Sequence, residues 1–317
     1  TFPSSGKIQI SVTLITNGFR VTTTKNTSSN WQYGYVALGG TDLEAVGRND
    51  AQAIPSVIGA KAFTSGGVAN PNLALANFNA AGVIPDYGVS FAHPGYWMVS
   101  PTKQFAVTTT GNKRCQIQDA LLNFNLGGTV YSKATVTNFD ASNLNTNWSV
   151  APVGSVSGLD WLFMRLATGF KYEIGEFQIP GSTGSFTKNF TNTLLNPSAV
   201  FFLSAPTVNE GEANLQDDAK ISYGWVDGLL NMYNMSFYKQ NGANNYGNLH
   251  RNDYVFQNVT ALSTVAEKVS VTALTQGSMT LNVSGTVGAT SKVGYLAFGG
   301  GTAPLPGYLS DYGGMIS

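Results

Sequence analysis

The densest group of acidic side chains lies in one short polar stretch. The sequence NEGEANLQDD carries Glu210, Glu212, Asp217 and Asp218 within a few residues of one another. Hard cations such as Ca²⁺ bind several oxygen ligands of this kind, and loops between strands often supply them. The spacing differs from that of an EF-hand loop, however, so it favours a solvated loop, with a calcium site as the alternative. We therefore predict no metal ion and no other cofactor.

Pairs of carboxylates could also act as acid and base on a glycosidic bond. Four acidic residues stand in or beside expected strands: Asp160, Glu173, Glu176 and Asp227. Nothing in their spacing brings two of them to the separation that glycoside hydrolysis requires. A polysaccharide-degrading enzyme is therefore the weakest of the alternatives that we consider.

Nucleophilic catalysis finds equally little support. His93 and His250 are the two histidines, and neither lies in a local Ser-His-Asp pattern. Cys115 is the single cysteine, which excludes an intrachain disulfide and a cysteine metal cluster. We predict that the protein is not an enzyme and has no catalytic residues.

Aromatic side chains give the best candidates for binding. Tyrosine and tryptophan alternate with Asn and Gly in YGWVDGLLNMYNMSFY and in YKQNGANNYGNLHRNDY. Such side chains stack on sugars or anchor protein partners, and long loops on rigid sandwiches often carry recognition. We predict exposed aromatic loops with four candidate binding residues: Trp225, Tyr238, Tyr246 and Tyr254.

The composition limits the partners. Only 11% of the residues are charged, and 17 basic residues balance 17 acidic ones, whereas about 25% are charged in ordinary globular proteins. Because no basic surface is visible, we expect no nucleic acid as partner. No apolar stretch approaches the roughly 20 residues of a membrane span, so we expect no membrane insertion. The start at Thr1 rather than Met suggests a trimmed N-terminus.

Short strands joined by turns dominate the rest of the chain. Residues 7–15, 132–139 and 268–274 alternate polar and apolar side chains, and each run precedes a turn and a second Thr/Asn-rich strand. This pattern predicts an all-β fold of tandem antiparallel β-sandwiches, jelly-roll-like, with very little helix. We allow one short helix over residues 70–82, where Asn and Pro precede an apolar run, and one or two helical turns over 41–48.

An internal repeat sets the expected domains. Residues 7–40, 128–169 and 266–300 share one order of strands and turns. An upstream half recurs as well, with residues 54–63 resembling 196–205 and residues 87–95 resembling 220–228. We therefore predict a closing half-unit at 1–50 and whole β-sandwich units at 51–180 and 181–317. A lone pair of strands is marginally stable, so the half-unit must pack on its neighbour or be completed by a strand from another chain.

One resemblance follows from these motifs. The succession of ISYGWVDG, VSVTALTQGSMTLNVSG and VGYLAFGG, after a Pro-containing apolar strand, resembles β-sandwich modules of tailed-bacteriophage virion proteins. The likeness covers residues 196–300, extends loosely over 55–169 and includes 7–40 as a half. It implies a structural role in capsid decoration, a fibre or a tail, in an extracellular virion, and carries over no catalytic residues.

The expected function follows from the resemblance and the low charge. We expect a non-enzymatic virion structural protein that works as a homo-oligomer, with other copies of itself and other virion proteins as partners. The alternative is a carbohydrate-binding adhesin or receptor-binding module that uses the Tyr/Trp loops on a host surface glycan.

Overall fold

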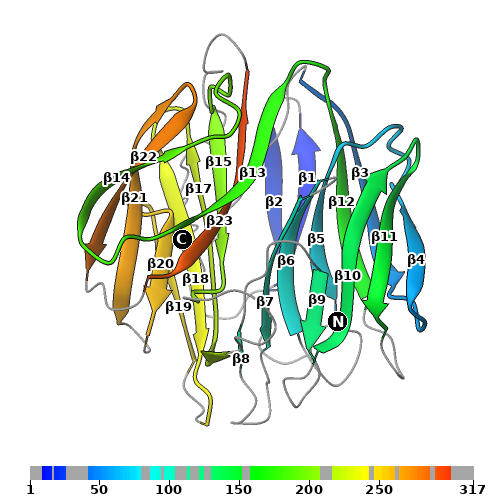
Figure 1. Cartoon of the computed structure of the whole chain (residues 1–317), viewed down its shortest axis with the longest axis horizontal. Helices are drawn as coiled ribbons and strands as arrows, with labels where there is room; N and C mark the ends of the chain where they lie inside the picture. The colour runs from blue at the N-terminus through cyan, green and yellow to red at the C-terminus, as the bar shows by residue number, and fades with distance from the viewer. Residues whose placement is uncertain are drawn as a thin grey trace. The chain divides into compact units, whose positions relative to one another are not determined.

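The computed structural model consists of antiparallel β-strands, and the residues that it describes contain no helix (Figure 1). The all-β fold predicted from the alternating pattern is thereby confirmed. The described residues are 9–15, 18–25, 42–79, 86–93, 96–103, 113–114, 121–124, 130–151, 158–207, 216–242, 246–260, 264–285 and 290–300.

The first sandwich consists of a seven-stranded and a four-stranded sheet. The seven-stranded sheet has the order β16-β8-β7-β6-β5-β12-β3. Its strands are β3 (Leu43–Ala53), β5 (Leu73–Asn79), β6 (Asp86–His93), β7 (Tyr96–Lys103), β8 (Lys113–Arg114), β12 (Gly158–Leu166) and β16 (Gln216–Asp217). The four-stranded sheet, in the order β4-β11-β10-β9, comprises β4 (Gly59–Thr64), β9 (Leu121–Phe124), β10 (Val130–Phe139) and β11 (Asn143–Val150).

The second sandwich pairs a six-stranded with a four-stranded sheet. The six-stranded sheet has the order β13-β23-β15-β17-β18-β19. Its strands are β13 (Lys171–Gln178), β15 (Ala199–Ser204), β17 (Ala219–Asp227), β18 (Met232–Lys239), β19 (Tyr246–Arg251) and β23 (Lys292–Gly299). The four-stranded sheet, in the order β14-β22-β21-β20, comprises β14 (Gly184–Asn189), β20 (Phe256–Val259), β21 (Val265–Thr275) and β22 (Ser278–Gly285).

The two sandwiches share one strand order. The four-stranded sheets correspond strand by strand, as β4-β11-β10-β9 and β14-β22-β21-β20. In the larger sheets, the strand order β3-β12-β5-β6-β7-β8 corresponds to β13-β23-β15-β17-β18-β19. The hairpins β10–β11 and β21–β22 even carry a bulge at the same place, after Val136 and after Val271. This shared order supports the repeat expected between residues 128–169 and 266–300, whose common origin stays a prediction.

One of the expected matches between the upstream halves is wrong as a structural equivalence. Residues 54–63 lead into β4, whereas residues 196–205 form β15, and these strands occupy different places in their sheets. A Pro-Ser pair before an apolar run is too short a pattern to fix a strand position. Residues 87–95 and 220–228, by contrast, fall on β6 and β17, which are equivalent strands.

Both predicted helical segments are strands. Residues 70–82 contain β5, in which Leu73 packs in one apolar cluster while Ala74 and Ala76 pack in another. Because both faces of this strand are covered, it begins with the unbroken apolar run LALA, which periodicity cannot distinguish from a buried helix. Residues 41–48 fall largely on β3.

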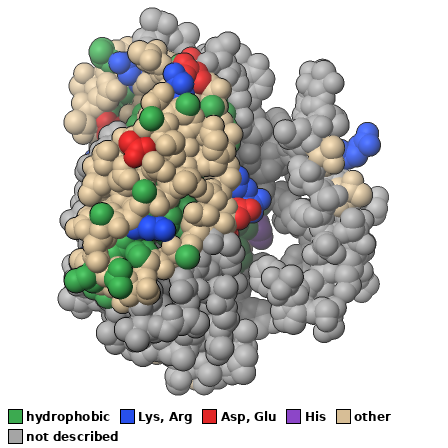
Figure 2. Space-filling model, turned by 90° about the vertical axis from the view of Figure 1, so that its right-hand side faces the viewer, with side chains coloured by type: hydrophobic (Ala, Val, Ile, Leu, Met, Phe, Trp, Pro, Cys, Tyr) green, Lys and Arg blue, Asp and Glu red, His purple; other side chains and the backbone are tan. Residues whose placement is uncertain are grey.

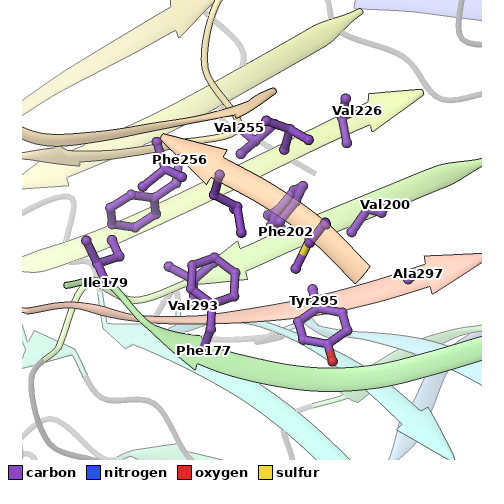
Figure 3. Close-up of a cluster of buried hydrophobic side chains, with 14 of the residues drawn as sticks. Phe177, Ile179, Val200, Phe202, Val226, Val255, Phe256, Val293, Tyr295 and Ala297 are labelled. Carbon is purple, nitrogen blue, oxygen red and sulfur yellow. The ribbon is translucent and has the colours of Figure 1, made fainter. Parts of the chain in front are cut away.

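Each sandwich encloses its own apolar core. In the first, Trp148 of β11 and Trp161 of β12 are 1% exposed and pack around Phe63 of β4. In the second, Phe177 and Phe202 of the six-stranded sheet pack in one cluster with Phe256 of the four-stranded sheet (Figure 3). These cores hold the two sheets of each sandwich together.

A third apolar cluster joins strands of the two sandwiches. Met164 of β12 packs with residues of the second sandwich that include Leu203 and Leu296. The Tyr172 hydroxyl donates a hydrogen bond of 2.8 Å to the carbonyl oxygen of Asn72. Burial raises the pKa of Tyr172, so this hydroxyl stays protonated as a donor. Val36–Ser310 accordingly forms one compact unit.

The sheets do not stop at the expected domain limits. Strand β3 crosses residue 50, and β13 precedes residue 180 although it belongs to the second sandwich. Strand β16, which lies between β15 and β17 in the chain, pairs with β8 of the first sandwich. As domain limits, 50 and 180 remain predictions.

The N-terminal unit is described only through one hairpin. Strands β1 (Gln9–Ile15) and β2 (Gly18–Lys25) pair antiparallel, with Val12 opposite Val21. Among the described strands, each pairs with the other alone. Thr1–Tyr35 and residues 311–317 form a compact unit of their own.

Candidate functional site

Trp225, a predicted binding residue, belongs to a cluster of rings on β17, β18 and β19. It lies on the same face of β17 as Ile221 of the third apolar cluster, because side chains two residues apart share a face. Its half-buried ring stacks on Tyr233 of β18, with centroids 4.5 Å apart and planes inclined by 27°. The Tyr233 hydroxyl lies 2.9 Å from Nδ1 of His250 on β19. We call Trp225, Tyr233 and His250 the aromatic cluster.

The aromatic cluster combines a stacking surface with a neutral polar group. All three side chains are half-buried, and burial lowers the pKa of His250 below its ordinary value. At neutral pH the imidazole is therefore uncharged and can exchange a hydrogen bond with the Tyr233 hydroxyl in either direction. Tyr233 was not among the predicted residues, although the hairpin turn between β17 and β18 sets it opposite Trp225.

Tyr254 follows β19 and lies among cations. Its half-buried ring has the Lys268 ammonium 5.3 Å and the Arg251 guanidinium 5.8 Å from its centroid. Arg251 also forms an ion pair of 2.7 Å with Asp253, which lowers the pKa of that carboxyl. The tyrosine is thus held by cation–π contacts and is not the tip of a free loop.

The remaining aromatic predictions have different outcomes. Tyr238 is wrong as an exposed binding residue, because it lies in β18 and is only 4% exposed. Its ring lies over the amino group of Lys220, whose Nζ is 5.6 Å from the ring centroid. Tyr246 begins β19, but its side chain lies outside the described residues.

The predicted acidic stretch is described only in part. Glu210 and Glu212 lie outside the described residues. Asp217 accepts a hydrogen bond of 3.1 Å from the Asn241 side chain, and Asp218 accepts one of 2.7 Å from the Asn241 backbone. These carboxylates hold a turn. Within the described part of the chain, no group of three or more acidic, His or Cys side chains could hold a metal ion.

The acidic residues considered for glycoside hydrolysis support the fold where their contacts are described. Glu173 accepts hydrogen bonds from the backbone of Thr191 and Asn192, at 3.1 and 2.7 Å, and from the Tyr295 hydroxyl at 2.6 Å. Asp227 is fully buried and caps the turn after β17 by accepting from the backbone of Leu229 at 2.9 Å. Neither carboxylate is free to act on a substrate.

A second group of buried polar side chains joins the two sheets of the second sandwich. Lys220 of β17 is 7% exposed, Asn258 of β20 9% and Glu267 of β21 1%. Nζ of Lys220 lies 3.4 Å from Oδ1 of Asn258, and Nδ2 of Asn258 lies 3.0 Å from Oε2 of Glu267. The Ser291 hydroxyl donates to the same carboxylate oxygen. We call Lys220, Asn258, Glu267 and Ser291 the buried polar cluster.

The buried polar cluster was not predicted from the sequence. Lys220 and Asn258 stand 38 positions apart, and Asn258 and Glu267 nine. No local motif joins three residues at such spacing. A weak signal exists in Glu267, which replaces an apolar residue at an inward position of β21, two residues before the core residue Val269.

Comparisons with known proteins find no relative. No protein-family model matches the chain, no curated protein matches it, and no solved structure matches it. The described residues also contain no helix of the length and apolarity that a membrane crossing needs.

Proposed function

We propose that the protein is a non-enzymatic structural component of a virus particle, as capsid decoration, fibre or tail component, and that it acts through protein–protein assembly. The likeness of residues 196–300 to phage virion modules supports the virion part of the proposal, including an extracellular location. Its partners are other copies of itself and other virion proteins. The structural use of Glu173 and Asp227 supports the absence of catalysis.

The proposal for assembly is based on the two edge strands β3 and β4, which we call the open side of the first sandwich. Among the described strands, β3 pairs only with β12 and β4 only with β11. The two edges lie together, since the Asn49 side chain of β3 donates to the Thr64 carbonyl of β4 at 2.8 Å. Edge strands present unpaired backbone groups and can pair with another chain. At the other edge of the seven-stranded sheet, β8 is already extended by β16.

Side chains on this open side suit an interface. Val57 and Ile58, just before β4, are 69% and 70% exposed, and Val46, on the face of β3 that points away from β4, is 52% exposed. Large exposed apolar side chains beside free strand edges are typical of interaction sites. Charges are sparse: in the coloured, described part of the face in Figure 2, Lys, Arg, Asp and Glu side chains are few among uncharged ones. Charged residues are depleted in interface cores in the same way.

The charges that β3 does carry are already neutralised within the chain. Arg48 pairs with Asp50, and Glu44 pairs with Arg165 of β12 at 2.6 Å. Many edge strands avoid association by presenting unpaired charge, above all lysine. Because β3 lacks lysine and its ions are paired, charge offers little protection at this strand, whereas β4 carries Lys61.

Light scattering over a concentration series tests the proposal. We expect the wild-type chain to form an oligomer above its 33.5 kDa monomer mass. The double variant Val57→Lys/Ile58→Lys should dissociate while its circular dichroism stays unchanged. Leu229→Lys is the matched control, because Leu229 is 69% exposed on a turn of the second sandwich. A wild type that remains monomeric at every concentration refutes the assembly role.

The aromatic cluster favours a second candidate function, binding of a host surface glycan. Trp225 stacked on Tyr233 offers an aromatic surface, and His250 holds a polar group beside it. Sugars bind to such surfaces by stacking on the ring and by hydrogen bonds to a few polar groups. Glycan-array binding that is lost in Trp225→Ala and kept in Tyr254→Ala would support this function. The absence of any retained glycan would remove it.

A further inference from the structure

We propose that Lys220 and Asn258 become joined by an intramolecular isopeptide bond, with Glu267 as the proton-transfer group. The bond would link β17 of the six-stranded sheet to β20 of the four-stranded sheet, and so tie the two sheets of the second sandwich covalently. The three side chains that the reaction needs are an amine, a carboxamide and a carboxylate. They meet in the buried polar cluster.

The geometry places the nucleophile beside its target. Nζ of Lys220 lies 3.4 Å from Oδ1 of Asn258, so a small shift brings it onto the adjacent carbon Cγ. Amide nitrogen and oxygen are assigned from the hydrogen bonds, and Glu267 fixes Nδ2 on its own side by accepting from it at 3.0 Å. Two reacting groups that the fold holds side by side gain much of the rate advantage of an intramolecular reaction.

Burial supports the reaction in two ways. Because Lys220 is 7% exposed, little water competes with its amine for the carboxamide of Asn258. Tyr238 covers the lysine, with its ring centroid 5.6 Å from Nζ. Water is also kept from the 9% exposed Asn258, so hydrolysis of its carboxamide does not compete.

Glu267 has one oxygen for each of two tasks. Oε2 orients the leaving amide nitrogen of Asn258 and accepts from Ser291. Oε1 is buried and accepts no hydrogen bond. A buried carboxylate oxygen without a partner is costly and calls for an explanation. Proton transfer during bond formation supplies one, since a base must take a proton from the attacking amine.

The reaction balances without any co-reactant. The neutral amine of Lys220 attacks Cγ of Asn258, a C–N bond forms, and the carbonyl electrons move to Oδ1. Glu267 takes a proton from the amine nitrogen and gives a proton to Nδ2. The Cγ–Nδ2 bond then breaks, the carbonyl re-forms and ammonia leaves. A primary amine and a carboxamide have become a secondary amide and ammonia, and the Glu267 carboxylate is restored.

The first sandwich lacks this chemistry at the equivalent place. Strand register sets Lys133 opposite Leu122 in β10 and β9, as it sets Lys268 opposite Gln257 in β21 and β20. The next residues in each strand pair are then Ser132 and Asn123, in place of Glu267 and Asn258. The asparagine recurs but the carboxylate does not. We therefore expect one bond in each chain.

Mass spectrometry of the denatured full-length chain tests the proposal. The wild type should be lighter than its sequence mass by one ammonia molecule, about 17 Da. Trypsin should yield one branched peptide that joins the segments around Lys220 and Asn258. Glu267→Gln and Lys220→Arg should show the full sequence mass. Lys239→Arg is the matched control, because Lys239 is also buried, at 8% exposed, on the neighbouring strand β18, and it should keep the mass loss.

Two results would overturn the proposal. One is a folded wild type, judged by its cooperative unfolding, that has the full sequence mass. The other is a mass loss that maps to a linear peptide, because ring closure at an Asn-Gly pair such as Asn241–Gly242 also releases ammonia. The wild-type spectrum decides the matter even if Glu267→Gln or Lys220→Arg fails to fold.

Discussion

Replacing Gly224 with alanine probes the closest approach between β17 and the segment that leads into β20. A Cβ atom at this position would lie 1.8 Å from the carbonyl oxygen of Val255 and 2.6 Å from its carbonyl carbon. Real Cβ contacts are essentially never shorter than 3.0 Å. Val255 would therefore have to retreat by more than an ångström.

The structure leaves Val255 little room for such a movement. Its N–H donates to the Val269 carbonyl at 2.8 Å, and its side chain is fully buried in the core of the second sandwich. Its own carbonyl accepts from the Asn234 side chain at 3.2 Å. Overpacking costs about 1–3 kcal/mol, and a buried hydrogen bond left unmade costs about 1–3 kcal/mol more. We expect Gly224→Ala to lose about 3–5 kcal/mol of unfolding free energy.

Urea unfolding followed by tryptophan fluorescence measures the effect. Gly181→Ala is the control, because a Cβ there would meet nothing closer than Thr290 Cγ2 at 3.6 Å. An exposed glycine of this kind should change stability by no more than about 0.5 kcal/mol. The m value should stay the same in both variants, since the same surface is exposed on unfolding.

Equal stability of the two alanine variants would refute this reasoning. It would mean that β20 can move away from β17 at little cost, and hence that the sheet spacing is soft at this point. The register that brings Asn258 of β20 to Lys220 of β17 would then be loose as well. A loss confined to Gly224→Ala supports a rigid contact.

Three further predictions concern hydrogen bonds and pH. Hydrogen bonds, above all from the Ser142 backbone and then from the Asn145 side chain, lower the pKa of Asp140 from 3.8 to about 2. The stability that these hydrogen bonds add is therefore present above pH 3.8 and is lost as the pH falls toward 2. Acid unfolding of wild type against Asp140→Asn should show this difference, and identical pH profiles would contradict it. Burial lowers the pKa of His250 below 6.5, so this group stabilises the fold fully above pH 6.5 and loses its contribution as the pH falls through the lowered value. A histidine NMR titration, assigned with His250→Gln, should give a midpoint below pH 6.5. A midpoint at or above pH 6.5 would be inconsistent with burial. Tyr295→Phe removes the 2.6 Å hydrogen bond to a carboxylate and should cost about 1.5–3 kcal/mol in urea unfolding, whereas a wild-type midpoint would show that the bond contributes nothing.

Local alternation in the sequence was enough to predict the fold class. In β21, residues such as Val269 and Val271 are buried while their neighbours are less so, as period-two patterning requires. The same reasoning failed for β5, because its two faces lie against different cores and the alternation disappears. A strand buried on both sides carries no polar face to reveal it.

The residues of the candidate site could likewise be predicted from the sequence only in part. Sequence composition alone singled out Trp225, since aromatic side chains among Asn and Gly are conspicuous, but it also placed the buried Tyr238 among the exposed rings. Side-chain type is a local property, whereas exposure depends on which strands cover a face. Lys220, Asn258 and Glu267 show the limit most clearly, because they lie on three strands and meet only when two sheets pack face to face. The sequence determined that the chain forms strands; the long-range pairing and stacking of those strands determined which polar groups lose water and face one another.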